Sequence, residues 1–196
     1  TSVIAIALGA VLLLWTGIAS WRTMLSVFAG GAVMAVLFEH QRTKGQLMYI
    51  ANDDTNRVFD LTFLTDAIDK TGLPHVFEHS VLDGSEKYPS RTLWFNVAYQ
   101  TYNTYMNAFT QSRLTSYPVA SLSEAQLLKY ADYYTDACLH PLVVEDESIF
   151  HEEAWRYRLA DASDPLTIEG TVYASANGLP VNPHVFGYDT ARKIGC

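Results

Sequence analysis

Two hydrophobic periods follow one another along this chain. Between residue 33 and residue 62, apolar and polar side chains alternate in short runs rich in β-branched and aromatic residues, with turn-forming residues between them. Further along, apolar residues also recur every three or four positions. The pattern predicts strands at Val33–Phe38, Leu47–Ala51, Arg57–Thr62, Met106–Thr110 and Thr115–Ser121, and helices at His75–Leu82, Thr92–Thr101, Glu124–Leu139 and Asp146–Tyr157.

Two of these helices carry clear end signals. Gly72-Leu73-Pro74 precedes the first helix, and Pro is tolerated in a first turn. We expect that helix to stop near Gly84. Ser123 is the expected N-cap of the longest helix, which His140-Pro141 ends because the residue before Pro avoids the α region. A sheet with helices packed on one face gives an α+β fold class.

The first 31 residues differ from the rest. Val3–Ala19 is an almost unbroken apolar run, and with its continuation to Trp21 it approaches the roughly 20 residues that cross a bilayer. Three interpretations stay open for residues 1–31: a membrane span within residues 1–21, a secretory signal peptide that lacks a basic leader, or a segment foreign to the domain that follows.

Composition excludes some classes of function. The formal charge of −8, with acidic residues spread over the middle and C-terminal parts, argues against a nucleic-acid-binding surface. The only two cysteines, Cys138 and Cys196, give neither a disulfide framework nor a metal-binding spacing. We therefore expect a reducing compartment, the cytoplasm or an organelle matrix, with membrane anchoring as the alternative.

The candidate chemistry lies in the sequence His75-Val76-Phe77-Glu78-His79. It reads H-x-x-E-H, the inverted zincin motif. One helical turn separates His75 from His79, so both imidazoles can hold one Zn²⁺ while Glu78 reaches the water on the metal. The alternative is a purely structural role, in which a partly buried helix uses its His and Glu side chains in ordinary hydrogen bonds.

The residues around the motif carry a wider resemblance. The stretch GLPHVFEHSVLDGSEKYP resembles the active-site helix of the pitrilysin/insulysin superfamily, above all its presequence-protease branch. About 140 consecutive positions continue the likeness, including NTYMNAFTQSRLTSYP and PLTIEGTVYA. It implies a split α/β roll over residues 32–174, with His75 and His79 as zinc ligands and Glu78 as the catalytic base. It also implies that Asn107, Ala108 and Phe109 form an edge strand that pairs with extended peptide substrates.

One position departs from the family pattern. The branch supplies its third zinc ligand from a Glu in a segment resembling G-x-V-x-N-E-M, and Ser175 occupies that place, 96 residues after His79. A hydroxyl is a poor zinc ligand at neutral pH. Glu169 and His184 are nearby in sequence, but neither occupies the matching position. Residues 175–196 show no resemblance and form a divergent tail.

The resulting prediction is part of a zinc endopeptidase that degrades unfolded peptides. Because the chain is much shorter than family members and would lack their C-terminal half, we expect it to be weakly active or inactive alone. The alternatives are a peptide-binding module without zinc and a membrane-anchored interaction protein.

Glu152 and Glu153 align with a family segment resembling Q-E-G-W-R, which suggests a supporting role. For Glu152, a position on a solvated helix face is favoured. Tyr99, Tyr102 and Tyr105 are expected to be packing residues.

Overall fold

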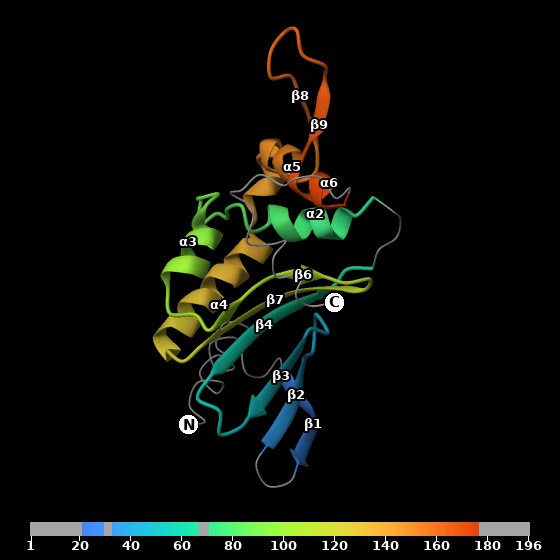
Figure 1. Cartoon of the computed structure of the whole chain (residues 1–196). Helices are drawn as coiled ribbons and strands as arrows, with labels where there is room; N and C mark the ends of the chain where they lie inside the picture. The colour runs from blue at the N-terminus through green and yellow to red at the C-terminus, as the bar shows by residue number, and fades with distance from the viewer. Residues whose placement is uncertain (1–20, 30–32, 67–70, 177–196) are drawn as a thin grey trace.

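A computed structural model describes residues 21–29, 33–66 and 71–176 of the chain (Figure 1). The region proposed as a membrane span or signal peptide lies almost wholly outside these residues. Within the described ranges, no helix is both long and apolar enough to span a bilayer.

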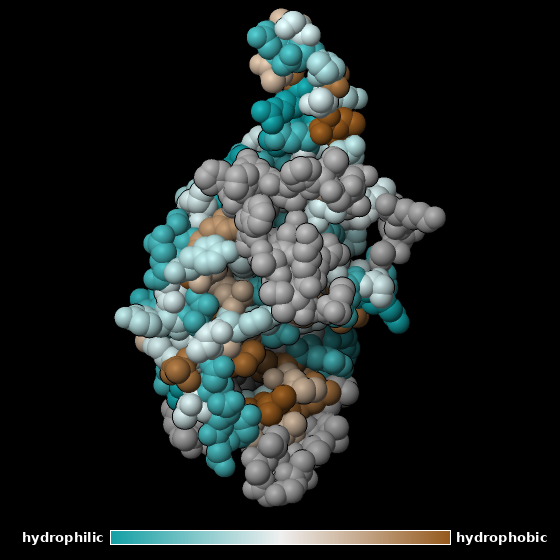
Figure 2. Space-filling view, viewed as in Figure 1, coloured by the Kyte–Doolittle hydropathy of each residue, from teal (hydrophilic) through white to brown (hydrophobic). Residues whose placement is uncertain are grey.

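The N-terminal part of the described chain forms an antiparallel meander. Strands β1 (Trp21–Ala29), β2 (Val33–His40) and β3 (Gln46–Ala51) pair in that order. The β1–β2 pairing joins residues on both sides of the boundary predicted at residue 31, and that boundary stays a prediction. On β3, Met48 and Ile50 are 61% and 52% exposed, and Figure 2 shows apolar surface in this lower part of the molecule.

A second antiparallel sheet carries the main core. Its central strand β7 (Leu114–Ser121) pairs on one edge with β4 (Arg57–Leu64). On the other edge it pairs with two short strands, β5 (Tyr105–Met106) and β6 (Phe109–Thr110). The single strand predicted for Met106–Thr110 is therefore interrupted at Asn107 and Ala108, although the Asn107 N–H still donates to the Pro118 carbonyl over 3.1 Å.

Three helices lie on one side of this sheet (Figure 1). They are α2 (Leu73–Ser80), α3 (Leu93–Gln100) and α4 (Glu124–Leu139), and they agree with the predicted helices. The core between the helices and the sheet is aromatic. Its buried side chains include Trp94, Tyr117, Val119, Leu127 and Tyr134.

Helix ends follow the expected local chemistry. Gly72 caps α2 with a left-handed φ of 72°, and Pro74 stands in the first turn. Gly84, beyond the end of α2, has a φ of 120°, which only glycine adopts without strain. The Ser123 side chain caps α4 by accepting from the Gln126 N–H.

The predicted helix Asp146–Tyr157 is too long. A short 3₁₀ turn, η2 (Leu142–Val144), precedes α5 (Glu147–Glu153), which ends before Ala154. The alternating residues that follow form β8 (Arg156–Arg158), which pairs with β9 (Thr167–Glu169) in a projecting hairpin (Figure 1). Trp155-Arg156-Tyr157-Arg158 has period two, and a cross-strand partner decides between strand and helix for so short a run.

One further expectation is corrected. Tyr99 and Tyr102 are 67% and 81% exposed, and Tyr105 is 49% exposed, so these rings do not pack in the core. The final described element is α6 (Thr171–Ala176), and the domain end expected at Ala174 stays a prediction. The rest of the divergent tail lies outside the described residues.

Candidate metal centre

Helix α2 gathers the three residues of the H-x-x-E-H motif. One ligand atom from each of His75, Glu78 and His79 lies within 4.8 Å of the others. The two imidazole rings are 4.9 Å apart between centroids and inclined by 73°. Such a group of two imidazoles and a carboxylate fits the donor preference of Zn²⁺.

Burial differs among the three side chains. Glu78 is 2% exposed and His79 is 7% exposed, whereas His75 is half-buried. Desolvation strengthens electrostatic interactions at the buried end of the motif. Helix α2 turns Glu78 and His79 toward the interior because Val76, on the same side of the helix as His79, packs against Phe150, Ala154 and Val172.

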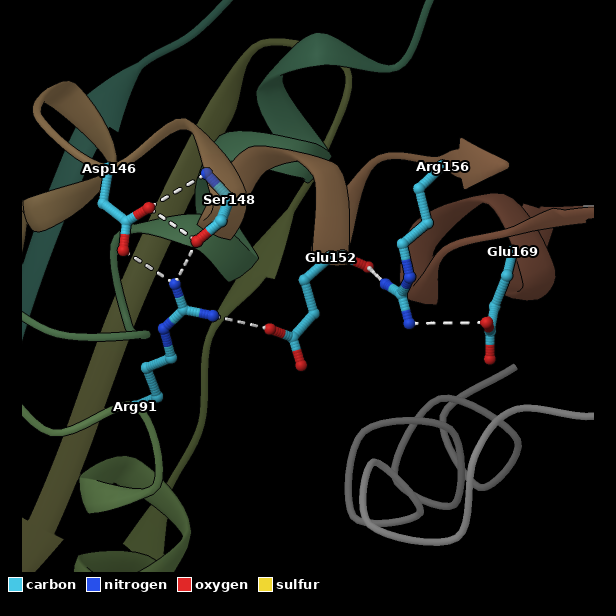
Figure 3. A network of polar contacts seen from close by, with 6 residues as sticks. All are labelled: Arg91, Asp146, Ser148, Glu152, Arg156 and Glu169. Carbon is cyan, nitrogen blue, oxygen red and sulfur yellow. Dashed lines mark hydrogen bonds and ion pairs between the residues drawn. The ribbon is translucent and has the colours of Figure 1, made fainter. Parts of the chain in front are cut away.

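His79 has a buried carboxylate partner from a distant part of the chain. Its Nδ1 lies 2.9 Å from Oε2 of Glu153, at the C-terminal end of α5. Glu153 is itself 7% exposed. The neighbouring Glu152 points to solvent instead and binds Arg91, with 2.8 Å between Nη1 and Oε2 (Figure 3).

A second, half-buried acid stands next to this pair. Asp83 and Thr171 lie near the Glu153 carboxylate. Burial, together with the neighbouring charge of Glu153, raises the pKa of Asp83 to about 9. Burial also raises the pKa of Glu153 to about 7. Of the two acids, Asp83 has the higher pKa and is the one that keeps its proton when only one of them is ionised. Nothing in the local sequence VLDGS pointed to Asp83 in advance.

The position matched to the third zinc ligand lies on α6. Thr171 and Ser175 are one helical turn apart and share a face of this helix. Helix α6 contacts α5, and its Val172 packs with Val76 of α2 and with Ala154. Glu169, a nearby acid in sequence, belongs to the hairpin instead, where it pairs with Arg156 and Arg158 at 3.4 Å and 3.2 Å. His184 lies outside the described residues.

The predicted substrate strand runs beside the motif helix. Helix α2 contacts β6, which contains Phe109. Ala108 is buried in the aromatic core, and the Tyr134 hydroxyl donates to the Asn107 carbonyl over 2.9 Å. In the described part of the chain, β6 pairs through one edge only, with β7.

Comparison with known proteins identifies the family. The chain is 38% identical over 149 residues to presequence protease 1 of Arabidopsis thaliana, an alignment covering 76% of this chain and 14% of that protein. It is 37% identical over 157 residues to Protein HypA of Clostridium perfringens, covering 80% of this chain and 16% of that protein. The chain belongs to the presequence-protease branch of the pitrilysin/insulysin superfamily.

This superfamily consists of metallopeptidases, and its fold agrees with the architecture described above. The crystal structure of pitrilysin superposes with a TM-score of 0.54 at 19% identity, over 66% of this chain and 14% of that one. The chain thus spans roughly a seventh of the length of the superfamily relatives it matches.

The N-terminal part also matches a different family. A model described as the NQR2, RnfD, RnfE family matches residues 1–62, less than half of the chain. This match includes the apolar run and extends through β1 to β3 into β4. Because it crosses residue 31, the boundary between an N-terminal segment and the superfamily domain stays a prediction.

Proposed function

We propose that this chain contributes the zinc-binding half-site of an endopeptidase that degrades unfolded peptides. The observation that carries the proposal is the convergence of His75, Glu78 and His79 within 4.8 Å in a member of a metallopeptidase superfamily. His75 and His79 would hold the metal. The site would work in an organelle matrix or the cytoplasm, in line with chloroplastic and mitochondrial proteins among the relatives.

Glu78 is assigned the proton transfers. Bound zinc would polarise the scissile carbonyl and acidify the attacking water. The Glu78 carboxylate takes a proton from that water and delivers it to the leaving amine nitrogen. Its burial supports this role, because a carboxylate held away from bulk solvent keeps a fixed orientation toward the reacting atoms.

The substrate is proposed to bind as an added strand along Asn107, Ala108 and Phe109. The pairing of β6 through one edge in the described chain, and its contact with α2, support this placement. Main-chain hydrogen bonds would supply affinity for many sequences, and the half-buried Phe109 would contribute to a side-chain pocket. Such binding requires an extended, unfolded peptide.

Ser175 limits the activity expected of the chain alone. Hydrolytic zinc sites commonly use three protein ligands and a water, and the serine hydroxyl would leave two imidazoles. The C-terminal half that family resemblance expects to enclose the substrate would also be needed. We therefore propose that this polypeptide cleaves unfolded peptides very poorly or not at all by itself.

A peptide-cleavage assay tests this proposal. The full chain, loaded with zinc, would be incubated with a quenched fluorescent peptide library beside a Glu78→Gln variant. We expect near-background cleavage by both proteins. Robust cleavage by the unmodified chain that Glu78→Gln abolishes would show that the site is complete without a glutamate at position 175.

A peptide-binding module without catalysis is the second candidate. Ser175 and the one-sided pairing of β6 favour it. This candidate predicts that unfolded peptides bind with the same affinity before and after chelation, and that His79→Ala leaves binding unchanged. A zinc-dependent affinity would favour the peptidase site.

A further inference from the structure

We infer that Glu153 is a positioning residue for His79, fixing the tautomer and the direction of the imidazole that the proposed function assigns to the metal. The metal-binding role of His79 in this inference rests on the proposed function. Its geometric basis is independent: Nδ1 of His79 and Oε2 of Glu153 are 2.9 Å apart and both side chains are buried.

The chemistry of the two groups determines the proton's place. Carboxylate oxygens only accept hydrogen bonds, and a neutral imidazole carries one N–H. The contact with Glu153 therefore places the hydrogen on Nδ1 and leaves the Nε2 lone pair for a metal. Histidine ligands in metal sites ordinarily donate their second N–H to such an acceptor, which orients the ring and raises its basicity.

Packing fixes Glu153 in this position from two directions. Directly after it, Ala154 packs with Val76 of α2 and Val172 of α6. At the other end of α5, Arg91 binds the Asp146 carboxylate and the Ser148 hydroxyl, and it also reaches Glu152 (Figure 3). Arg91 thus ties the segment that follows α2 to α5, the helix that carries the acceptor.

Two further polar groups lie near the acceptor. They are Asp83 and Thr171, so polar groups from three segments besides its own surround the Glu153 carboxylate. A side chain needed only to fill space would not need to be an acid here, because an apolar residue of similar volume avoids the cost of burying a charge. The matched comparison is Glu152, which is adjacent on α5 but half exposed and bound to Arg91.

The tautomer of His79 can be measured without metal. Long-range ¹H–¹⁵N correlation spectra of the full, chelator-treated chain at a pH of about 8, above the ordinary histidine pKa of about 6.5, distinguish Nδ1–H from Nε2–H. His79→Asn assigns the signal. We expect Nδ1–H in the unmodified chain and in Glu153→Gln, whose amide oxygen still accepts. Glu153→Leu should shift the population to Nε2–H, and Glu152→Gln should change nothing.

An Nε2–H tautomer in the unmodified chain would overturn the inference, and this result does not depend on any variant folding. The inference would also be overturned if Glu153→Leu folds and keeps Nδ1–H. It would be overturned as well if Glu152→Gln shifts the tautomer as far as Glu153→Leu does. Zinc affinity, measured by chelator competition, should fall roughly 10–100-fold in Glu153→Leu and stay unchanged in Glu152→Gln. If the unmodified chain binds no zinc, the proposed function loses its metal while the tautomer still decides the role of Glu153.

Discussion

Gly170 lies directly against the backbone of Ala154. A Cβ atom at position 170 would stand 2.3 Å from the Ala154 carbonyl oxygen and 2.7 Å from its carbonyl carbon. No rotation of a side chain relieves contacts with backbone atoms. This close approach brings the start of α6, and with it Thr171 and Ser175, to the end of α5.

Gly170→Ala should therefore destabilise the fold. Overpacking of this kind costs about 1–3 kcal/mol. The matched control is Gly45→Ala, where the nearest atom would be Oγ1 of Thr43 at 3.4 Å, and we expect a change within about 0.5 kcal/mol. Urea unfolding of both variants gives the comparison, and equal midpoints would contradict the packing described for α6.

Local sequence patterns predicted most elements of this fold. Alternation placed β2, β3, β4 and β7, and the cap residue Ser123 marked the start of α4. The signals succeed because each depends on neighbours within a few residues. The same reasoning failed for Trp155–Arg158, where pairing with Thr167–Glu169 decided the conformation.

The surroundings of the candidate site were less predictable. The motif itself fixes His75, Glu78 and His79 on one helix, so their proximity follows from helical geometry. The partner of His79 comes from 74 residues away. No periodicity encodes such a contact, and a family segment suggested only that Glu152 or Glu153 had a supporting role. Burial in the folded chain distinguishes the two.

Tyr134 links the aromatic core to the proposed substrate strand. Its buried hydroxyl accepts from the Trp94 indole over 3.2 Å and donates to the Asn107 carbonyl over 2.9 Å. Tyr134→Phe removes both bonds, and we expect a loss of about 1–3 kcal/mol in unfolding free energy. Tyr99→Phe, at an exposed ring, serves as control in the same thermal unfolding series. Equal melting temperatures for the two variants would contradict this role.

Asp83 makes stability depend on pH. The folded chain binds the Asp83 proton up to about pH 9, whereas the ordinary carboxyl value is 3.8. Between these values the native state holds more protons than the unfolded state, so unfolding free energy falls as pH rises. Asp83→Asn, which needs no proton, should flatten that fall.

Urea unfolding in the presence of chelator, repeated across this pH interval, measures the slope. Asp53→Asn, at an exposed turn, is the control and should retain the slope of the unmodified chain. An Asp83→Asn variant with that same slope would show that Asp83 does not carry the buried proton.

The most direct test of the account is to restore the missing ligand. Ser175→Glu should bind one zinc per chain at least about tenfold more tightly than the unmodified chain, because a third protein ligand completes the hydrolytic zinc set. The Ser175→Gln variant, whose new side chain is similar in size to glutamate but uncharged, should not bind zinc more tightly than the unmodified chain. Zinc content after dialysis against a weak chelator measures the retained metal. Adding His79→Ala to Ser175→Glu should abolish the increase in zinc binding. Zinc retention that is equal in all four proteins, or that survives His79→Ala, would contradict a metal site built on α2.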